Sequence, residues 1–129
     1  MKTPKNELVI PFGLPGLNEI IMVARGNRYA SARQKKKYTR LVEELLIQGC
    51  IPEEPYRLID IEFTWTESGR ARDPDNVRAG AKFILDAMVN QAIIVDDSMK
   101  YIKLLADKFK RGKKRAVSVK WTVHEEGTQ

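Results

Sequence analysis

The 129-residue sequence contains a single cysteine and a single histidine. With Cys50 alone, no disulfide can form within the chain, which fits a reducing compartment such as the cytoplasm. With His124 alone, a histidine-based catalytic triad lacks its components, and so does a zinc site built from several Cys and His ligands. These two shortages exclude disulfide-stabilised scaffolds and hydrolases that depend on several histidines.

Long hydrophobic runs are also missing. No apolar run approaches the roughly 20 residues that cross a bilayer, and the apolar stretch at 8–10 is too short for the core of a secretory signal. We therefore expect a soluble, cytoplasmic protein without a membrane partner.

Common nucleotide- and calcium-binding loops are absent from the sequence. It contains neither GxxxxGK[ST] nor GxGxxG, so we expect no nucleotide cofactor held by such a loop. An EF-hand that begins at Asp73 is excluded, because Arg78 stands where Gly is required and Ile84 where the bidentate Glu belongs.

Positive charge is in excess, since 23 Lys and Arg against 17 Asp and Glu give a formal net charge of +6. This balance favours a polyanionic partner, because protein contacts to phosphates release bound counterions. Two basic groups are candidate DNA contacts, although a solvated helix face also explains the first. They are a stripe at helical spacing, Arg33, Lys36, Lys37 and Arg40, and the run Lys110, Arg111, Lys113, Lys114 and Arg115.

Hydrophobic periodicity predicts a mixture of strands and helices. The predicted strands are 7–12, 58–66, 101–106 and 117–123, with 110–115 as the turn before the last one. The predicted helices are 17–24, 31–49 and 76–90. Because 129 residues suit one hydrophobic core, we expect a single α+β domain, residues 1–129, whose mixed, mainly antiparallel sheet packs against two main helices.

Negative charge gathers in RDPDN at 72–76 and in IIVDDS at 93–98. Asp73 and Asp75 can converge if Pro74 bends the backbone between them, and Asp96 and Asp97 offer further oxygen donors. Carboxylates that lie close together raise one another's pKa unless a cation lies among them. Mg²⁺ binds carboxylate and phosphate oxygens, so we expect these four aspartates to hold Mg²⁺, with Mn²⁺ as a substitute.

Each acidic motif also has an ordinary structural explanation. Asp75 or Asn76 is a natural cap for the predicted 76–90 helix, and DDS after an apolar run is typical of a turn. Lys82 precedes Asp86 by four residues, so it either forms a surface pair with Asp86 or stabilises charge that develops on a phosphate. Both interpretations stay open on the residues alone.

The order of these residues carries a family resemblance. The segment RDPDNVRAGAKFILDAMVNQAIIVDDS, residues 72–98, resembles the RusA family of Holliday junction resolvases in the form found in phages and prophages of Gram-positive bacteria. The family pattern is D-x-D-N, a helical Lys, an Asp-Ala-Leu-like segment and an Asp-Asp pair. It is matched in order by Asp73, Asp75, Asn76, Lys82, Asp86, Ala87, Met88, Asp96 and Asp97.

The resemblance implies a RusA-like fold and a Mg²⁺-dependent, structure-selective endodeoxyribonuclease of DNA recombination and repair. Such an enzyme acts as a homodimer that resolves a four-way DNA junction by paired symmetric nicks; the apolar 20–23 stretch is a candidate dimer contact or part of the core. Carried over, Asp73, Asp75 and Asp97 are the catalytic metal-binding acids. Lys82 is the catalytic cation at the scissile phosphate. Arg78 is the rival for that role and is also a candidate DNA contact. The alternatives are a nuclease of the same chemistry that acts on flaps or forks, and a DNA-binding module without catalysis.

Overall fold

A four-stranded mixed sheet organises the computed structural model, which describes residues 3–124. Its strands are β1 (Glu7–Ile10), β2 (Ile59–Glu67), β3 (Ile102–Arg111) and β4 (Ala116–Val123), in the spatial order β1-β4-β2-β3. Strand β4 is antiparallel to β1 and to β2, whereas β2 and β3 are parallel. The predicted α+β class with a mixed, mainly antiparallel sheet is confirmed.

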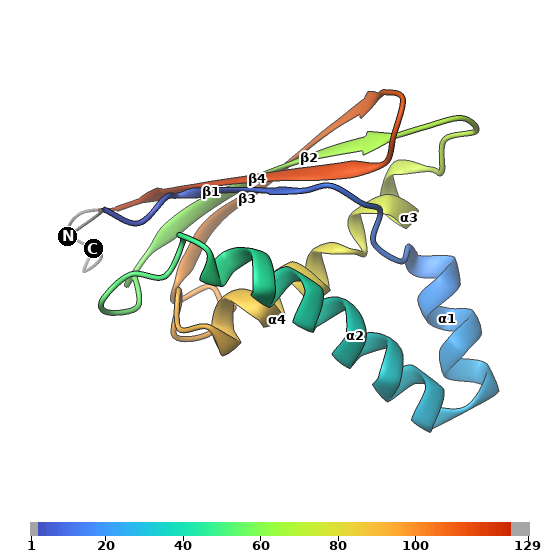
Figure 1. Ribbon diagram of the computed structural model, residues 1–129, viewed down its shortest axis with the longest axis horizontal. Coiled ribbons are helices and arrows are strands. Elements are labelled where there is room, and N and C mark those ends of the chain that lie inside the picture. Colours follow the sequence, from blue (N-terminus) through green and yellow to red (C-terminus); the bar gives the residue numbers. More distant parts are fainter. Residues whose placement is uncertain (1–2, 125–129) are drawn as a thin grey trace.

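The helices gather on one face of this sheet. They are α1 (Leu17–Gly26), α2 (Arg28–Ile47), α3 (Pro74–Arg78) and α4 (Ala81–Asn90). Helices α2 and α4 run beneath the sheet, and α1 projects from the end at which α3 lies (Figure 1). Helices α2 and α4 lie where the two main helices, 31–49 and 76–90, were predicted, although α4 covers only part of the second. Within residues 3–124, every helix is too short or too polar to cross a membrane.

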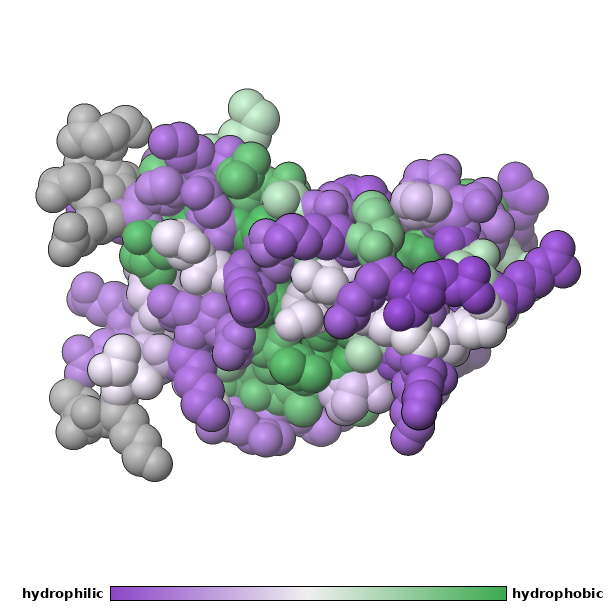
Figure 2. Space-filling view, turned by 90° about the horizontal axis from the view of Figure 1, so that it is seen from above, coloured by the Kyte–Doolittle hydropathy of each residue, from purple (hydrophilic) through white to green (hydrophobic). Residues whose placement is uncertain are grey.

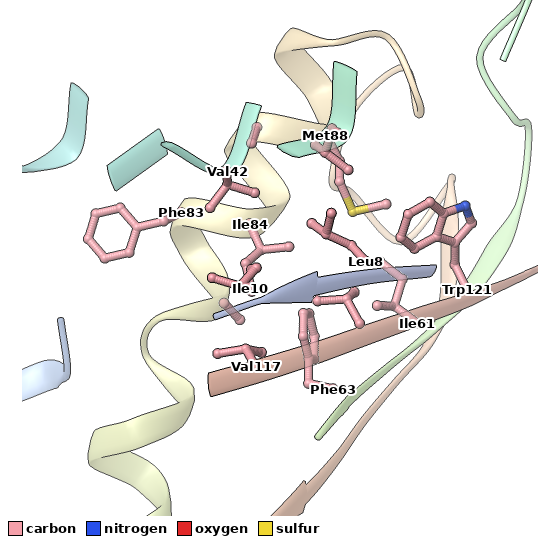
Figure 3. Close-up of a cluster of buried hydrophobic side chains, with 14 of the residues drawn as sticks. Leu8, Ile10, Val42, Ile61, Phe63, Phe83, Ile84, Met88, Val117 and Trp121 are labelled. Carbon is pink, nitrogen blue, oxygen red and sulfur yellow. The ribbon is translucent and has the colours of Figure 1, made fainter. Parts of the chain in front are cut away.

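Alternation along β2 explains why the core lies between the sheet and the helices. Ile61, Phe63 and Trp65 are buried, whereas the residues between them are half-buried on the other face. Val42 of α2 and Ile84 of α4 pack against this apolar face from the helix side (Figure 3). Each large apolar side chain that is fully buried contributes about 1.5–3 kcal/mol, so this layer dominates the stability of the fold.

The opposite face of the sheet is exposed. Figure 2 looks onto the molecule from the side of the sheet and shows mainly hydrophilic side chains around smaller hydrophobic areas. Glu62, Lys108, Lys110 and Lys120 line a shallow depression of about 420 Å³ on this face. Val9 and Leu104 are exposed apolar residues of the strands.

The predicted continuous helix at 76–90 is wrong, because the chain turns at 79–80 and forms α3 and α4 separately. The backbone of Gly80 passes close to the core: a Cβ there would lie 2.9 Å from Leu14 Cβ and 3.4 Å from Trp65 Cζ3. This contact requires glycine at the turn. The predicted caps are wrong as well, since Asp73 occupies the N-cap position of α3 and Gly80 that of α4.

Strand β3 is longer than the predicted 101–106. Its pairing with β2 continues as far as Glu67 opposite Arg111, so Lys110 and Arg111 belong to a strand. The turn therefore occupies only 112–115 of the predicted 110–115.

Candidate nucleic-acid interface and acidic sites

The predicted basic stripe forms one surface of α2. Its four residues are exposed and line a single hollow of about 640 Å³, together with Val23 of α1 and the ring of Tyr38. They are Arg33, Lys36, Lys37 and Arg40. The ammonium group of Lys37 lies 5.2 Å from the Tyr38 ring centroid, so this hollow combines positive charge with an aromatic face.

A second hollow, of about 560 Å³, lies between α2, α4 and the connection that follows α4; we name it the α2–α4 groove. Its charged and polar lining residues are Lys35, Lys36, Thr39, Arg40 and Glu43 of α2, Asp86 and Asn90 of α4, and Asp96 and Asp97 of the connection. Lys36 and Arg40 line both hollows. The basic stripe therefore borders the second acidic motif directly.

Inside the α2–α4 groove, charges of opposite sign face each other. Lys35 Nζ lies 3.6 Å from Asp86 Oδ2, so Asp86 pairs with Lys35 and not, as the surface-pair interpretation predicted, with Lys82. Thr39 is only 6% exposed, and within residues 3–124 its hydroxyl oxygen has no hydrogen-bond partner. A buried hydroxyl left in this way costs about 1–3 kcal/mol.

The first acidic motif lies at the far end of α4. Asp73 and Asp75 are exposed at the start of α3, and Pro74 is the first residue of that helix. Asn76 accepts a hydrogen bond at Oδ1 from the backbone N–H of Asn18, at 3.0 Å. Asn76 therefore fastens the first turn of α1 to α3, a structural role for this residue of the motif.

Arg72 and Glu67, which the sequence analysis missed, hold the loop before α3 in place. Arg72 donates to both carboxylate oxygens of Glu67 at 2.8 Å, to the carbonyl of Leu14 at 3.1 Å and to Glu19 at 3.0 Å. The hydrogen bonds from Arg72 hold the pKa of Glu67 below its ordinary value, and Glu67 in turn raises the pKa of Arg72. The sequence did offer one sign that Glu67 is buried. It falls on the same side of β2 as the alternating buried residues and ends that series.

The two predicted catalytic cations differ in their environment. Arg78 Nε donates to Asp107 Oδ2 at 2.9 Å, and Trp65 Nε1 donates to the other oxygen of that carboxylate at 2.8 Å. Arg78 is therefore held in an ion pair between α3 and β3. Lys82 is exposed in the first turn of α4, so it is the freer of the two to meet a phosphate.

The second basic group lies beside the loop that leads to Asp73. Arg111 donates to the carbonyl of Gly69, and Arg115 Nε lies 3.6 Å from Glu67 Oε1. Lys110, Lys113 and Lys114 are exposed around them. Each acidic motif thus has its own basic neighbours.

These positions decide whether the four aspartates of one chain can share one Mg²⁺ ion. Figure 1 shows α3 at one end of α4 and the connection to β3 at the other. The 10 residues of α4 span about 15 Å, whereas carboxylate oxygens bind Mg²⁺ at about 2.0–2.1 Å. Within residues 3–124, no group of three or more Asp, Glu, His or Cys side chains is placed to hold one metal ion. The four aspartates of one chain, in this arrangement, do not fit the ion.

Comparison of the chain with protein-family models and with curated proteins finds no match. The resemblance in residues 72–98 therefore stays a prediction based on the motif.

Proposed function

We propose that the protein is a structure-selective endodeoxyribonuclease whose substrate is a four-way DNA junction. The observation that carries the proposal is the common border of the basic stripe and the second acidic motif, because Lys36 and Arg40 line a hollow together with Asp96 and Asp97. The cations attract a DNA backbone, since each phosphate contact releases counterions. A phosphate held there would lie beside carboxylates, whose oxygens are ligands that Mg²⁺ binds.

The distribution of positive charge supports a branched substrate. One basic group lies on α2 beneath the sheet, and the other lies at the β3–β4 turn (Figure 1). Contacts to phosphates position DNA without reading its bases. Two separate basic surfaces therefore favour recognition of the shape of a junction, whose arms diverge.

The proposal includes a homodimer and a divalent ion. Two symmetric cuts need two equivalent sites, which a two-fold dimer supplies. Asp96 and Asp97 of the α2–α4 groove would hold the ion, which would supply Lewis-acid chemistry to the phosphodiester. Within one chain we assign three roles. Lys36 and Arg40 bind the DNA backbone, Lys82 contacts a phosphate, and Asp75 and Asp97 provide carboxylates.

A second candidate, a junction-binding module without catalysis, is favoured by the separation of the two acidic motifs along α4. In this alternative, Asp73 and Asp75 serve only as residues at the start of α3. The module would bind a junction as well as the nuclease does, but it would release no product.

The test incubates the protein with labelled four-way junction, flap, fork and linear duplex, in Mg²⁺, in Mn²⁺ and in EDTA. We expect paired nicks in the junction, only with metal, and an Asp97→Asn variant that binds junction DNA but does not cut it. Binding without product under all conditions would establish the module instead, and preferred cutting of a flap or fork would assign the same chemistry to another substrate. Failure to bind any branched DNA would reject both candidates.

A further inference from the structure

Strand β3 is a long edge strand with one open side. It is last in the order of the sheet, and among the strands of residues 3–124 it pairs with β2 alone. Its 10 residues follow β2 regularly from Leu104 onward, because the one register shift lies between Ile59 and Asp60. An edge of this kind presents a row of backbone N–H and C=O groups to any extended chain that approaches it.

The two edges of the sheet are protected differently. Strand β1 has only four residues, Glu7–Ile10, and a strand so short offers little for another chain to pair with. Strand β3 contains no proline and, from Leu104 onward, no bulge. Of the usual protections of an edge it has charged side chains, and these select a partner by its charge. The β3 edge is therefore the one suited to receive a strand.

The side chains of β3 give this edge an apolar side and a basic side. Leu105 and Phe109 point toward the helices, as the buried residues of β2 that pair with them do, yet they are 41% and 44% exposed. Lys108 and Lys110 lie on the opposite face, where both line the shallow depression. Because successive residues of a strand point to opposite faces, a partner that matches both sides alternates apolar and acidic residues.

The other charges near this edge do not oppose an acidic partner. Asp107 is the one acidic residue of β3, and its carboxylate already accepts hydrogen bonds from Arg78 at 2.9 Å and from Trp65 at 2.8 Å. Lys108 Nζ lies 3.3 Å from Glu62 Oε1, but these side chains are 68% and 38% exposed. An exposed pair contributes at most about 1 kcal/mol, so Lys108 can contact a second carboxylate.

We propose that β3 binds an extended segment of another protein, in which acidic and apolar residues alternate, as an additional strand of the sheet. In strand addition, main-chain hydrogen bonds supply affinity and alternate side chains supply specificity. The acidic side chains of the segment face Lys108 and Lys110, and its apolar side chains cover Leu105 and Phe109. This surface is separate from the basic stripe of α2, and the proposal requires neither DNA nor a metal ion.

The same features disfavour two other occupants of the edge. A second copy of β3 would bring four basic residues, Lys103, Lys108, Lys110 and Arg111, against the same four, and like charges on neighbouring strands destabilise their pairing. DNA would be attracted by these cations. It would leave the exposed Leu105 and Phe109 uncovered, however, and it lacks the regularly spaced amides that pair with a strand.

The first experiment measures peptide binding to the wild-type protein by fluorescence anisotropy, without DNA. The probe is a short labelled peptide in which Glu and Val alternate, and we expect saturable binding. One control peptide has the same sequence with methylated backbone nitrogens, and a second has the same composition with Glu and Val in separate blocks. Each control should bind about tenfold more weakly or worse. Equal affinities for the three peptides would show attraction by charge alone and would overturn the proposal.

The second experiment exchanges the charges. The double variant Lys108→Glu with Lys110→Glu should lose the Glu–Val peptide, about tenfold or more, and should gain affinity for a peptide in which Lys and Val alternate. Lys36→Glu with Arg40→Glu makes the same change of charge on α2 and is the matched control, which should keep the Glu–Val peptide. A loss of peptide from the α2 variant alone would overturn the proposal. All four positions are exposed, and circular dichroism checks that the variants fold.

Hydrogen exchange then identifies the occupant of the edge. The Glu–Val peptide should increase the protection of amides in β3 and leave those of α2 unchanged. Protection of β3 that rises with the concentration of the protein alone would assign the edge to a second copy. Protection of β3 by a four-way junction, with release of the peptide, would assign it to DNA. Either result would overturn the proposal. None of these measurements uses nicking, so the outcome is independent of the proposed function.

Discussion

Glu67 and Arg72 form a two-point ion pair at the end of β2, with Nε 2.8 Å from Oε1 and Nη2 2.8 Å from Oε2. Their side chains are only 8% and 12% exposed. Arg72 also reaches the carbonyl of Leu14 and the carboxylate of Glu19. One guanidinium thus joins the end of the sheet, the segment before α1 and α1 itself, and it fixes the loop from which Asp73 emerges.

Replacing this guanidinium should destabilise the fold strongly. We expect Arg72→Ala to lower the free energy of unfolding by about 3–5 kcal/mol, because buried Glu67 loses its two-point partner and keeps only the more distant Arg115, at 3.6 Å. Urea denaturation followed by tryptophan fluorescence measures the change. The exposed Arg33→Ala is the matched control, with an expected change of less than about 0.5 kcal/mol. A loss below about 1 kcal/mol for Arg72→Ala would show that the ion pair contributes little to the stability of the fold.

The same pair predicts a loss of stability in acid. Arg72 lowers the pKa of Glu67 in the folded state, so the carboxylate contributes stability that is fully present above the unfolded pKa of about 4.3 and is lost as the pH falls through the folded value. The urea midpoint of the wild type should therefore decrease between about pH 5 and about pH 3. The Glu67→Gln variant should have a lower urea midpoint at neutral pH, and this midpoint should change less across the same pH window. The exposed Glu44→Gln variant should follow the wild-type profile. Parallel curves for all three proteins would contradict the assignment.

Two glycines of the first helical region should respond in opposite ways to alanine. At Gly16 a Cβ would lie 2.5 Å from Asn76 Oδ1 and 3.0 Å from the Asn76 carbonyl oxygen, so α1 must shift away from α3. We expect Gly16→Ala to cost about 1–3 kcal/mol. At Gly26 a Cβ would meet nothing within 4 Å, and Gly26→Ala should stabilise by about 0.5 kcal/mol. Thermal unfolding compares them, and equal effects would mean that α1 does not dock on α3 as described.

The basic stripe should set the salt dependence of DNA binding. Each phosphate contact that is removed reduces the slope of log K against log salt by about 0.9 on duplex arms. Lys36→Ala and Arg40→Ala should each weaken junction binding and lower this slope, as fluorescence anisotropy over a salt series would show. Lys120→Ala, on the exposed face of the sheet, is the control and should change neither quantity. Unchanged slopes for Lys36→Ala and Arg40→Ala would place the DNA elsewhere.

Local burial explains why parts of the fold could be predicted from the sequence. The alternation of Ile61, Phe63 and Trp65 reflects one buried face of β2, and the three-and-four spacing of Val42 and Leu46 reflects one buried face of α2. The break at 79–80 has no comparable local signal. The break depends on the close approach of Leu14 and Trp65 to Gly80. Both residues are distant from Gly80 in sequence, so hydrophobic periodicity alone predicts one helix where the structure has α3 and α4.

The candidate site also has parts that the sequence predicts and parts that it does not. The basic stripe was predictable, because residues three and four apart on a helix share a face. The positions of Asp75 and Asp97 were not, because the direction of α4 after the turn decides whether they meet. Arg72 carries no periodic signal, since its partners Glu67 and Glu19 come from different elements.

The place of β4 in the middle of the sheet affects the order in which the chain can fold. Among the strands of residues 3–124, β1 is paired with β4 alone, along Glu7–Ile10, although β4 follows the other three strands in the chain. During translation the backbone of β1 must therefore wait for residues more than 100 positions later. Contacts so distant in sequence slow folding, so an early segment with an apolar face stays without its strand partner until β4 has been made.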